Sequence, residues 1–135
     1  MASAQRSIPD RVRTIDAVAM AAYAGATWDW TQTHLDVAAA QAAGFERPIV
    51  DGQMLGALLA AHAQDAIGAG ARVTELAFRH AGPVLRDDRV RIRGVVVSDD
   101  GATVVLEQDV HVVDDTGNEL GHAIIAARTT VVVEG

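Results

Sequence analysis

The chain has 135 residues and a formal net charge of −7; 50% of the residues are hydrophobic and 21% are charged. The length predicts one domain over residues 1–135 that can bury a core without covalent staples, and the composition excludes a disordered chain. The absence of cysteine excludes disulfides, a thiol nucleophile and thiolate metal sites. All 11 basic residues are arginine, which excludes a lysine Schiff base, and the negative charge argues against a nucleic-acid partner.

The N-terminal residues 1–13 are polar and lack the apolar stretch of a signal peptide. The most apolar helical stretch, residues 54–66, is too short to span a bilayer and contains three polar side chains, those of His62, Gln64 and Asp65. We therefore expect a cytoplasmic protein with no membrane partner.

The first half of the chain is predicted to be mainly helical. A strand over residues 11–15 leads into a helix over residues 15–24, with Thr14 or Asp16 as its N-cap and Gly25 as its end.

The next segment is predicted to be less regular. Residues 27–33 hold two tryptophans without a helical period, which predicts a loop. Asp36 can cap a short alanine-rich helix over residues 37–43, and Pro48 favours extended backbone over residues 45–50.

The longest helix is predicted over residues 52–67, with Asp51 as N-cap and Gly68 as its end. Its large apolar residues recur at spacings of three and four, and small residues fill most other positions. A helix with so little bulk can be wrapped closely by a sheet. His62 is predicted to be a core or interface histidine.

The second half has an apolar period of two, which is typical of half-buried strands. The turn signals are at residues 98–101 and 114–117. The residues that alternate to share one face of each strand are Leu76, Phe78 and His80; Val90, Ile92 and Val96; Val104, Leu106, Val110 and Val112; and Ile124, Ala126 and Val132. Four antiparallel strands on one central helix predict an α+β fold. His80, His111 and His122 are expected to face solvent or an interface, and no histidine pair has a spacing that points to zinc.

Asp29 and His34 are the strongest candidates for chemistry. A carboxylate and an imidazole delivered by one loop can converge on one water, so that one removes a proton while the other donates one. The alternative is structural: Asp29 caps a turn and His34 is a half-buried or surface residue.

Gly52, at the start of the longest helix, is the third candidate. A helix N-terminus offers free N–H groups and partial positive charge, which suit a thioester oxygen that gains negative charge. A glycine also lets a ligand approach the backbone closely. The alternative is that Gly52 simply fits a tight junction.

The chain resembles the MaoC-like dehydratases, also known as (R)-specific enoyl-CoA hydratases. The resemblance is carried by Asp29-x4-His34, Gly44-Phe45-x-x-Pro48-Ile49-Val50-x-Gly52, and Phe78-Arg79-His80-Ala81-Gly82-Pro83-Val84 with Asp88. It implies a hot-dog fold, in which a curled antiparallel sheet wraps one long helix.

The resemblance also implies a reaction. Asp29 and His34 would be the catalytic pair, and the Gly52 N–H would polarise the thioester carbonyl. The substrate would be a trans-2-enoyl thioester of CoA or acyl carrier protein, and the product a (3R)-hydroxyacyl thioester. No metal or redox cofactor is implied.

The departures from the family pattern concern three places. Thr31 and Gln32 replace the usual Asn and Pro of the loop, Asp51 replaces a common His, and Asp87 stands where a turn glycine is frequent. The form Trp28-Asp29-x4-His34-x-Asp36 is similar to the small MaoC-like subunit of heteromeric hydratases in actinobacterial steroid side-chain degradation. In those enzymes a partner subunit completes a wide acyl pocket.

Substrate contacts are expected from five residues around this set: Trp28, Trp30, Val50, Asp51 and Met54. An indole beside Asp29 can raise the pKa of its carboxyl by desolvation, or the two indoles pack the loop or an interface. Asp51 is expected to turn away from the site and cap the helix.

The remaining charged residues are expected at the surface. Arg89, Arg91 and Arg93 form one face of a strand that is solvated or meets CoA phosphates, and Glu46 and Arg47 lie near the mouth.

Two other functions fit the sequence. One is a non-catalytic hot-dog subunit, against which the intact Asp29/His34 pair argues. The other is an acyl-CoA thioesterase with Asp51 or Asp65 as its carboxylate. As an enzyme the chain is expected to work as a homodimer or as a heteromer with a second MaoC-like subunit, because hot-dog domains leave an unpaired sheet edge.

Overall fold

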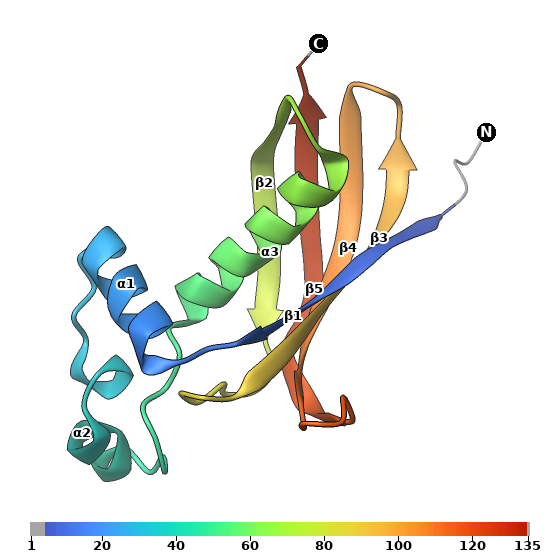
Figure 1. The fold of residues 1–135 in the computed structure, drawn as a ribbon. Coiled ribbons are helices and arrows are strands. Elements are labelled where there is room, and N and C mark those ends of the chain that lie inside the picture. The colour runs from blue at the N-terminus through green and yellow to red at the C-terminus, as the bar shows by residue number, and fades with distance from the viewer. Residues whose placement is uncertain (1–4, 135) are drawn as a thin grey trace.

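The computed structural model describes residues 5–134. It shows one five-stranded antiparallel sheet, with strand order β1-β3-β4-β5-β2, curled around a long helix (Figure 1). The elements are β1 (Arg6–Thr14), α1 (Ala17–Thr27), η1 (Gln32–His34), α2 (Val37–Ala42), α3 (Gly52–Ile67), β2 (Ala71–His80), β3 (Arg89–Asp99), β4 (Thr103–Val113) and β5 (Glu119–Val133). The predicted α+β class is confirmed.

Helix α3 has the predicted bounds and cap. The Asp51 carboxylate accepts a hydrogen bond from the Gln53 N–H at 2.9 Å, and Gly68 ends the helix. The core consists of this helix and the inward face of the sheet. Its fully buried side chains include Leu59, Ile92, Leu106, Ile124 and Val131.

Two aromatic rings of β2 pack directly against two glycines of α3. A Cβ on Gly56 would lie 2.8 Å from the Phe78 ring, and a Cβ on Gly52 would lie 2.5 Å from the His80 ring. Residues four apart on a helix and two apart on a strand each share one face, so the two pairs stack in register. The small residues of α3 therefore set how closely β2 approaches.

Buried polar side chains join α3 to the sheet. The amide nitrogen of Gln108 is hydrogen-bonded to the Leu59 carbonyl and to His62 Nδ1, both at 3.0 Å. Thr129 Oγ1 donates to the Gln108 amide oxygen at 2.6 Å, and His62 Nε2 donates to the Pro9 carbonyl at 2.7 Å. The prediction of a core histidine at position 62 is confirmed, and its partners come from β1 and β4.

The first two elements differ from their predicted bounds. Strand β1 begins at Arg6 rather than at residue 11, and α1 begins at Ala17 because Asp16 is the cap. The helix also runs through Gly25 to Thr27, since a left-handed residue, Trp28 at φ 59°, ends it instead.

An irregularity in β5 changes its inward face, whereas the predicted face of β4 is confirmed. Ala126 has φ 54° and is exposed, so the predicted face through Ala126 and Val132 is wrong. The inward face of β5 is instead Ile124, Ala127, Thr129 and Val131. A bulge adds one residue and reverses the alternation beyond it.

His111 is buried within this chain, which contradicts the prediction that it faces solvent or an interface. It follows irregular pairing in β4, and its ring lies 4.2 Å from that of His122, which is exposed as expected. Its Nδ1 lies 3.2 Å from Asp109 Oδ1. The arginines of β3 partly cover this side of the sheet through ion pairs, including Arg93 with Asp109 and Glu119.

Candidate active site

The candidate site lies where α1, η1 and α2 gather beside the N-terminal end of α3 (Figure 1). The left-handed Trp28 ends α1, and the Asp29 N–H still bonds the Ala24 carbonyl at 3.2 Å. This hydrogen bond fixes the position of Asp29 at the C-terminal end of α1. His34 follows on η1, a short 3-10 turn within the region predicted as loop.

Asp29 is partly exposed and one of its oxygens is occupied. Asp29 Oδ1 accepts from Thr31 Oγ1 at 2.6 Å and from the Thr31 N–H at 3.2 Å. These hydrogen bonds, with smaller contributions from Asp51 and His34, lower the pKa of the Asp29 carboxyl below its ordinary value. The expectation that a neighbouring indole raises this pKa is wrong, because hydrogen bonding outweighs desolvation. Asp29 is therefore ionised at neutral pH, and both hydrogen bonds from Thr31 go to Oδ1, which leaves Oδ2 free of Thr31.

His34 is oriented by the backbone. Its Nδ1 lies 2.7 Å from the Ile49 carbonyl oxygen, and the Ile49 N–H donates to the Thr33 carbonyl at 2.9 Å. A carbonyl can only accept, so Nδ1 carries the proton and donates. The Nε2 of the neutral ring is then a free proton acceptor.

Asp51 faces Asp29 and His34, so the expectation that it turns away is wrong. One oxygen or nitrogen atom from each of the three side chains lies within 4.8 Å of the others. Asp51 both caps α3 and borders the site. Its Oδ1 accepts the capping hydrogen bond, and its side chain lines the small cavity. Among residues 5–134 this is the only set of three whose ligand atoms come close enough for a metal ion.

A small cavity separates these groups. Its volume is about 10 Å³, close to what one water requires. It is lined by Met20, Tyr23, Ala24, Asp29, His34, Asp51 and Met54. Burial, with the charges of Asp51 and Asp29, raises the pKa of the Tyr23 hydroxyl, which therefore stays protonated and is a hydrogen-bond donor. The sequence did not single out Tyr23, because no spacing relates α1 to α3.

A second cavity of about 340 Å³ also borders His34. It is lined by His34, Ile49, Val50, Gly52, Leu55, His80, Gly82, Pro83 and Val84. His34 therefore borders both the small cavity and the larger one. The sequence-predicted residues Val50 and Gly52 both line the larger cavity.

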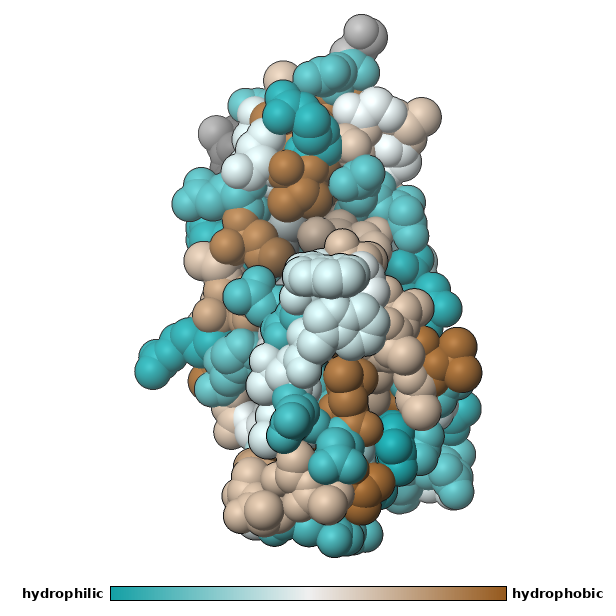
Figure 2. Space-filling model, turned by 90° about the vertical axis from the view of Figure 1, so that its left-hand side faces the viewer, coloured by the Kyte–Doolittle hydropathy of each residue, from teal (hydrophilic) through white to brown (hydrophobic). Residues whose placement is uncertain are grey.

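Trp28 and Trp30 lie outside both cavities. Their side chains are 79% and 48% exposed and meet edge to face at 5.7 Å. The end of the molecule that carries α1 and α2 shows apolar and polar side chains side by side (Figure 2). The two indoles therefore line neither cavity in this chain, and their contact with substrate stays a prediction.

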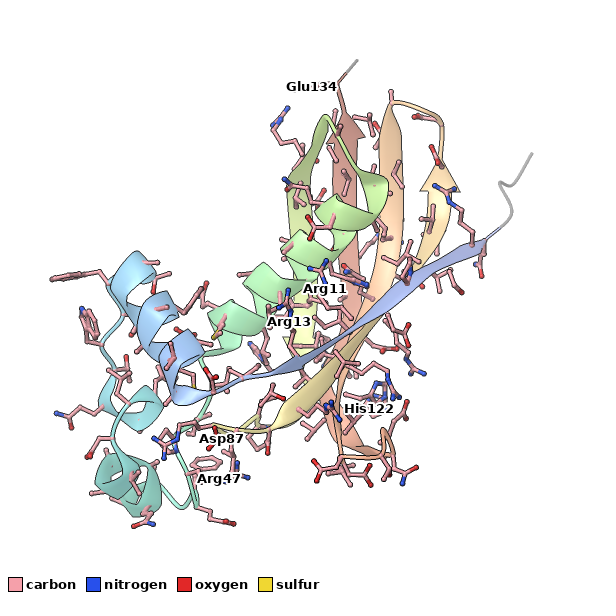
Figure 3. All side chains as sticks on the ribbon, viewed as in Figure 1. Arg11, Arg13, Arg47, Asp87, His122 and Glu134 are labelled. Atoms are coloured by element: carbon pink, nitrogen blue, oxygen red, sulfur yellow. The ribbon has the colours of Figure 1, made fainter. Side chains whose placement is uncertain are left out.

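The β2–β3 connection contacts the segment that leads into α3 through Arg47. Arg47, expected at the surface, is half-buried; it donates to the Arg86 carbonyl and pairs with Asp88 at 3.1 Å. Asp87 has φ 74°, the left-handed conformation for which the family uses glycine. Figure 3 shows Arg47 and Asp87 together at this end of the sheet.

A larger hollow of about 850 Å³ lies elsewhere. It is lined by residues of β1, β3, β4 and β5, and none of the candidate site residues lines it. The candidate site residues therefore do not lie in the largest of the three cavities. Within residues 5–134, no helix is both long and apolar enough to cross a membrane.

Solved structures similar to this one share its fold. One from Mycobacterium tuberculosis, the ChsH1-ChsH2 complex, has TM-score 0.85 and 20% identity over 99% of this chain and 100% of that chain. The (R)-hydratase from A. caviae involved in PHA biosynthesis has TM-score 0.80 and 23% identity over 99% and 97%. The M. tuberculosis HadBC (3R-hydroxyacyl-ACP dehydratase) complex has TM-score 0.71 and 19% identity over 95% and 93%. No curated protein matches the sequence.

These likenesses confirm the hot-dog fold that the sequence resemblance implied. The family model described as a MaoC like domain matches residues 3–117, most of the chain. The chain therefore belongs to the MaoC-like domain family.

Proposed function

We propose that the protein is a hydratase that adds water to a trans-2-enoyl thioester, or removes it in reverse. The observation that carries the proposal is the water-sized cavity between Asp29 and His34, with Gly52 at the adjoining larger cavity. This arrangement supplies a water, two groups that bind it and a donor for an oxyanion.

The proton transfers follow from the hydrogen bonds. A water in the small cavity donates to the free oxygen of Asp29 and to His34 Nε2. When its oxygen bonds to C3, one water proton passes to Nε2 and the C2=C3 electrons move toward the thioester. The ionised Asp29 stabilises the imidazolium, and the proton then passes from Nε2 to C2. The reaction balances with water alone as the second reactant.

The thioester oxygen gains negative charge as the enolate develops. The Gly52 N–H is the first donor of α3 and has no acceptor among the residues that the structure describes. A donor oriented in advance stabilises the enolate without reorganising, and one such donor is typically worth about 3 kcal/mol.

The finer identity of the substrate is part of the proposal. A (3R)-hydroxyacyl product accords with the names of the A. caviae (R)-hydratase and the HadBC (3R-hydroxyacyl-ACP dehydratase), and an acyl-carrier-protein thioester accords with the second name. We propose CoA as the alternative carrier and no cofactor besides the thioester. A bulky acyl group, such as a steroid side chain, requires more room than this chain encloses around Gly52. The exposed indoles beside Asp29 support a second MaoC-like subunit, identical or different, that completes the acyl pocket.

Thioester hydrolysis is the second candidate. The Asp51 carboxylate borders the same cavity at the start of α3, so it could direct a water at the thioester carbon instead of C3.

The intact Asp29/His34 pair, with both side chains held by hydrogen bonds, argues against a non-catalytic subunit.

Two substrates and two readouts test these functions. The purified protein is incubated with crotonyl-CoA and with a bulky enoyl-CoA, while the absorbance of the conjugated thioester and the free thiol are followed separately. Hydration removes the absorbance without releasing thiol, whereas hydrolysis releases thiol. Chiral analysis then assigns the hydroxyacyl product. Unchanged absorbance with both substrates, for the chain alone and for the complex purified from its host, would refute the hydratase.

A further inference from the structure

His80 is the last residue of β2, and its ring lies against the first turn of α3. The ring meets the edge of Phe78 at a centroid distance of 5.2 Å. Its Cε1 and Nε2 atoms lie 2.5 and 2.6 Å from the position that a Cβ on Gly52 would take. The end of β2 therefore places the His80 imidazole beside Gly52, the residue whose N–H is proposed to bind the thioester oxygen.

His80 also borders the larger cavity together with His34 and Gly52. No group in residues 5–134 is hydrogen-bonded to either of its ring nitrogens. An unpaired ring nitrogen at the wall of a cavity is free to meet whatever enters it.

The two donors are close enough to share one oxygen. A Cβ position lies about 2.5 Å from its own backbone nitrogen by standard geometry. Given the 2.6 Å to His80 Nε2, the nitrogens of His80 and Gly52 are at most about 5.1 Å apart. An oxygen that accepts at about 2.9 Å from each nitrogen can span up to about 5.8 Å.

We propose that His80 is a further catalytic residue, whose ring N–H donates to the thioester carbonyl oxygen beside the Gly52 N–H. This rests on the proposed function and extends it. Because negative charge on the oxygen grows toward the transition state, the donor acts mainly on kcat and only weakly on KM.

Two substitutions separate donation from packing. His80→Phe keeps a flat ring against Phe78 and Gly52 but removes the donor, whereas His80→Gln keeps a donor near the Nε2 position. We expect kcat to fall about tenfold to a hundredfold in His80→Phe, with KM changed less than threefold, and to recover in part in His80→Gln. His122→Phe is the matched control, since that exposed histidine lies on β5, away from the helices that form the site (Figure 3).

The hydrogen bond from His80 to the thioester oxygen can also be measured spectroscopically, without catalytic turnover. A conjugated dienoyl-CoA absorbs at longer wavelength when its carbonyl is polarised, so its bound spectrum measures the hydrogen bonds to that oxygen. The shift should be smaller in His80→Phe than in the wild-type protein and unchanged in His122→Phe. Equal kcat and an equal spectral shift in His80→Phe and wild type would overturn the assignment of His80. Wild-type protein that polarises the dienoyl group without hydrating any enoyl thioester would instead overturn the proposed reaction, and the His80→Phe spectrum would still decide the donor.

Discussion

His34 and Ile49 hold two distant segments of the chain in register. The His34 ring donates to the Ile49 carbonyl at 2.7 Å, while the Ile49 N–H donates to Thr33 at 2.9 Å. Ile49 also forms a bridge with Leu85 and stands three residues before Gly52. The proposed proton acceptor, His34, and the proposed oxyanion donor, Gly52, are therefore positioned by one short stretch of backbone.

Removing either group of the pair should abolish most turnover. We expect Asp29→Asn and His34→Ala each to lower kcat at least about a hundredfold while the fold survives, because both are partly exposed and outside the core. The double variant should lose little more than either single one, since both groups act on the same water. Steady-state kinetics beside circular dichroism checks this, and near wild-type turnover in either single variant would contradict it.

A side chain at position 52 should act in two ways. Gly52→Ala places its Cβ 2.5 Å from the His80 ring, so the ring must move, and the methyl group also narrows the approach to the N–H. We expect kcat/KM to fall sharply with α3 retained. Combining Gly52→Ala with His80→Phe in a double-mutant cycle measures their coupling. Additive losses would show that the two residues act separately, against the shared oxyanion site.

Asp51 should influence Asp29 as well as α3. Asp51→Asn places an amide N–H donor toward Asp29, so the low pKa of the Asp29 carboxyl should persist. Asp51→Ser keeps a helix cap but is too short for that contact, so the pKa should rise toward its ordinary value. The acid limb of the pH profile of kcat/KM should therefore move to higher pH in Asp51→Ser only. Asp36→Ser, which alters the cap of α2, is the control, and an unmoved limb would argue against the contact.

The buried network should matter for stability and not for catalysis. Thr129→Val leaves the Gln108 amide oxygen without its partner at almost unchanged volume, which should cost about 1–3 kcal/mol of unfolding free energy. Thr130→Val, at the next and less buried position, should change it little. Chemical denaturation measures both, and kcat should stay near the wild-type value.

The β4–β5 turn should weaken in acid. Hydrogen bonds from Thr116 and Asn118 lower the pKa of the Asp114 carboxyl from 3.8 to about 2. A lowered native pKa stabilises the fold above the unfolded value and loses that effect as the pH falls through the native one. Asp114→Ala should therefore lower Tm at neutral pH, with the difference shrinking between about pH 4 and pH 2. Asp115→Ala is the control, and a difference that persists below pH 2 would exclude ionisation as the cause.

The sequence by itself determined the elements whose signals are local. Asp51, Asp36 and Gly68 mark helix ends because a cap is decided by the residues within one turn, and the small residues of α3 predict close wrapping by a sheet. The motif that holds Asp29, His34 and Gly52 also predicted residues that the structure places around the two cavities.

Tertiary structure decided which side chains meet. An irregularity at Ala126 reversed the face of β5, because one inserted residue has no signature in a period of two. Asp51 turned toward Asp29, Tyr23 joined the small cavity, and His80 reached Gly52 across the gap between β2 and α3. Each of these contacts joins residues on different elements, and the packing of α3 in the curled sheet, not the spacing along the chain, fixes their distance.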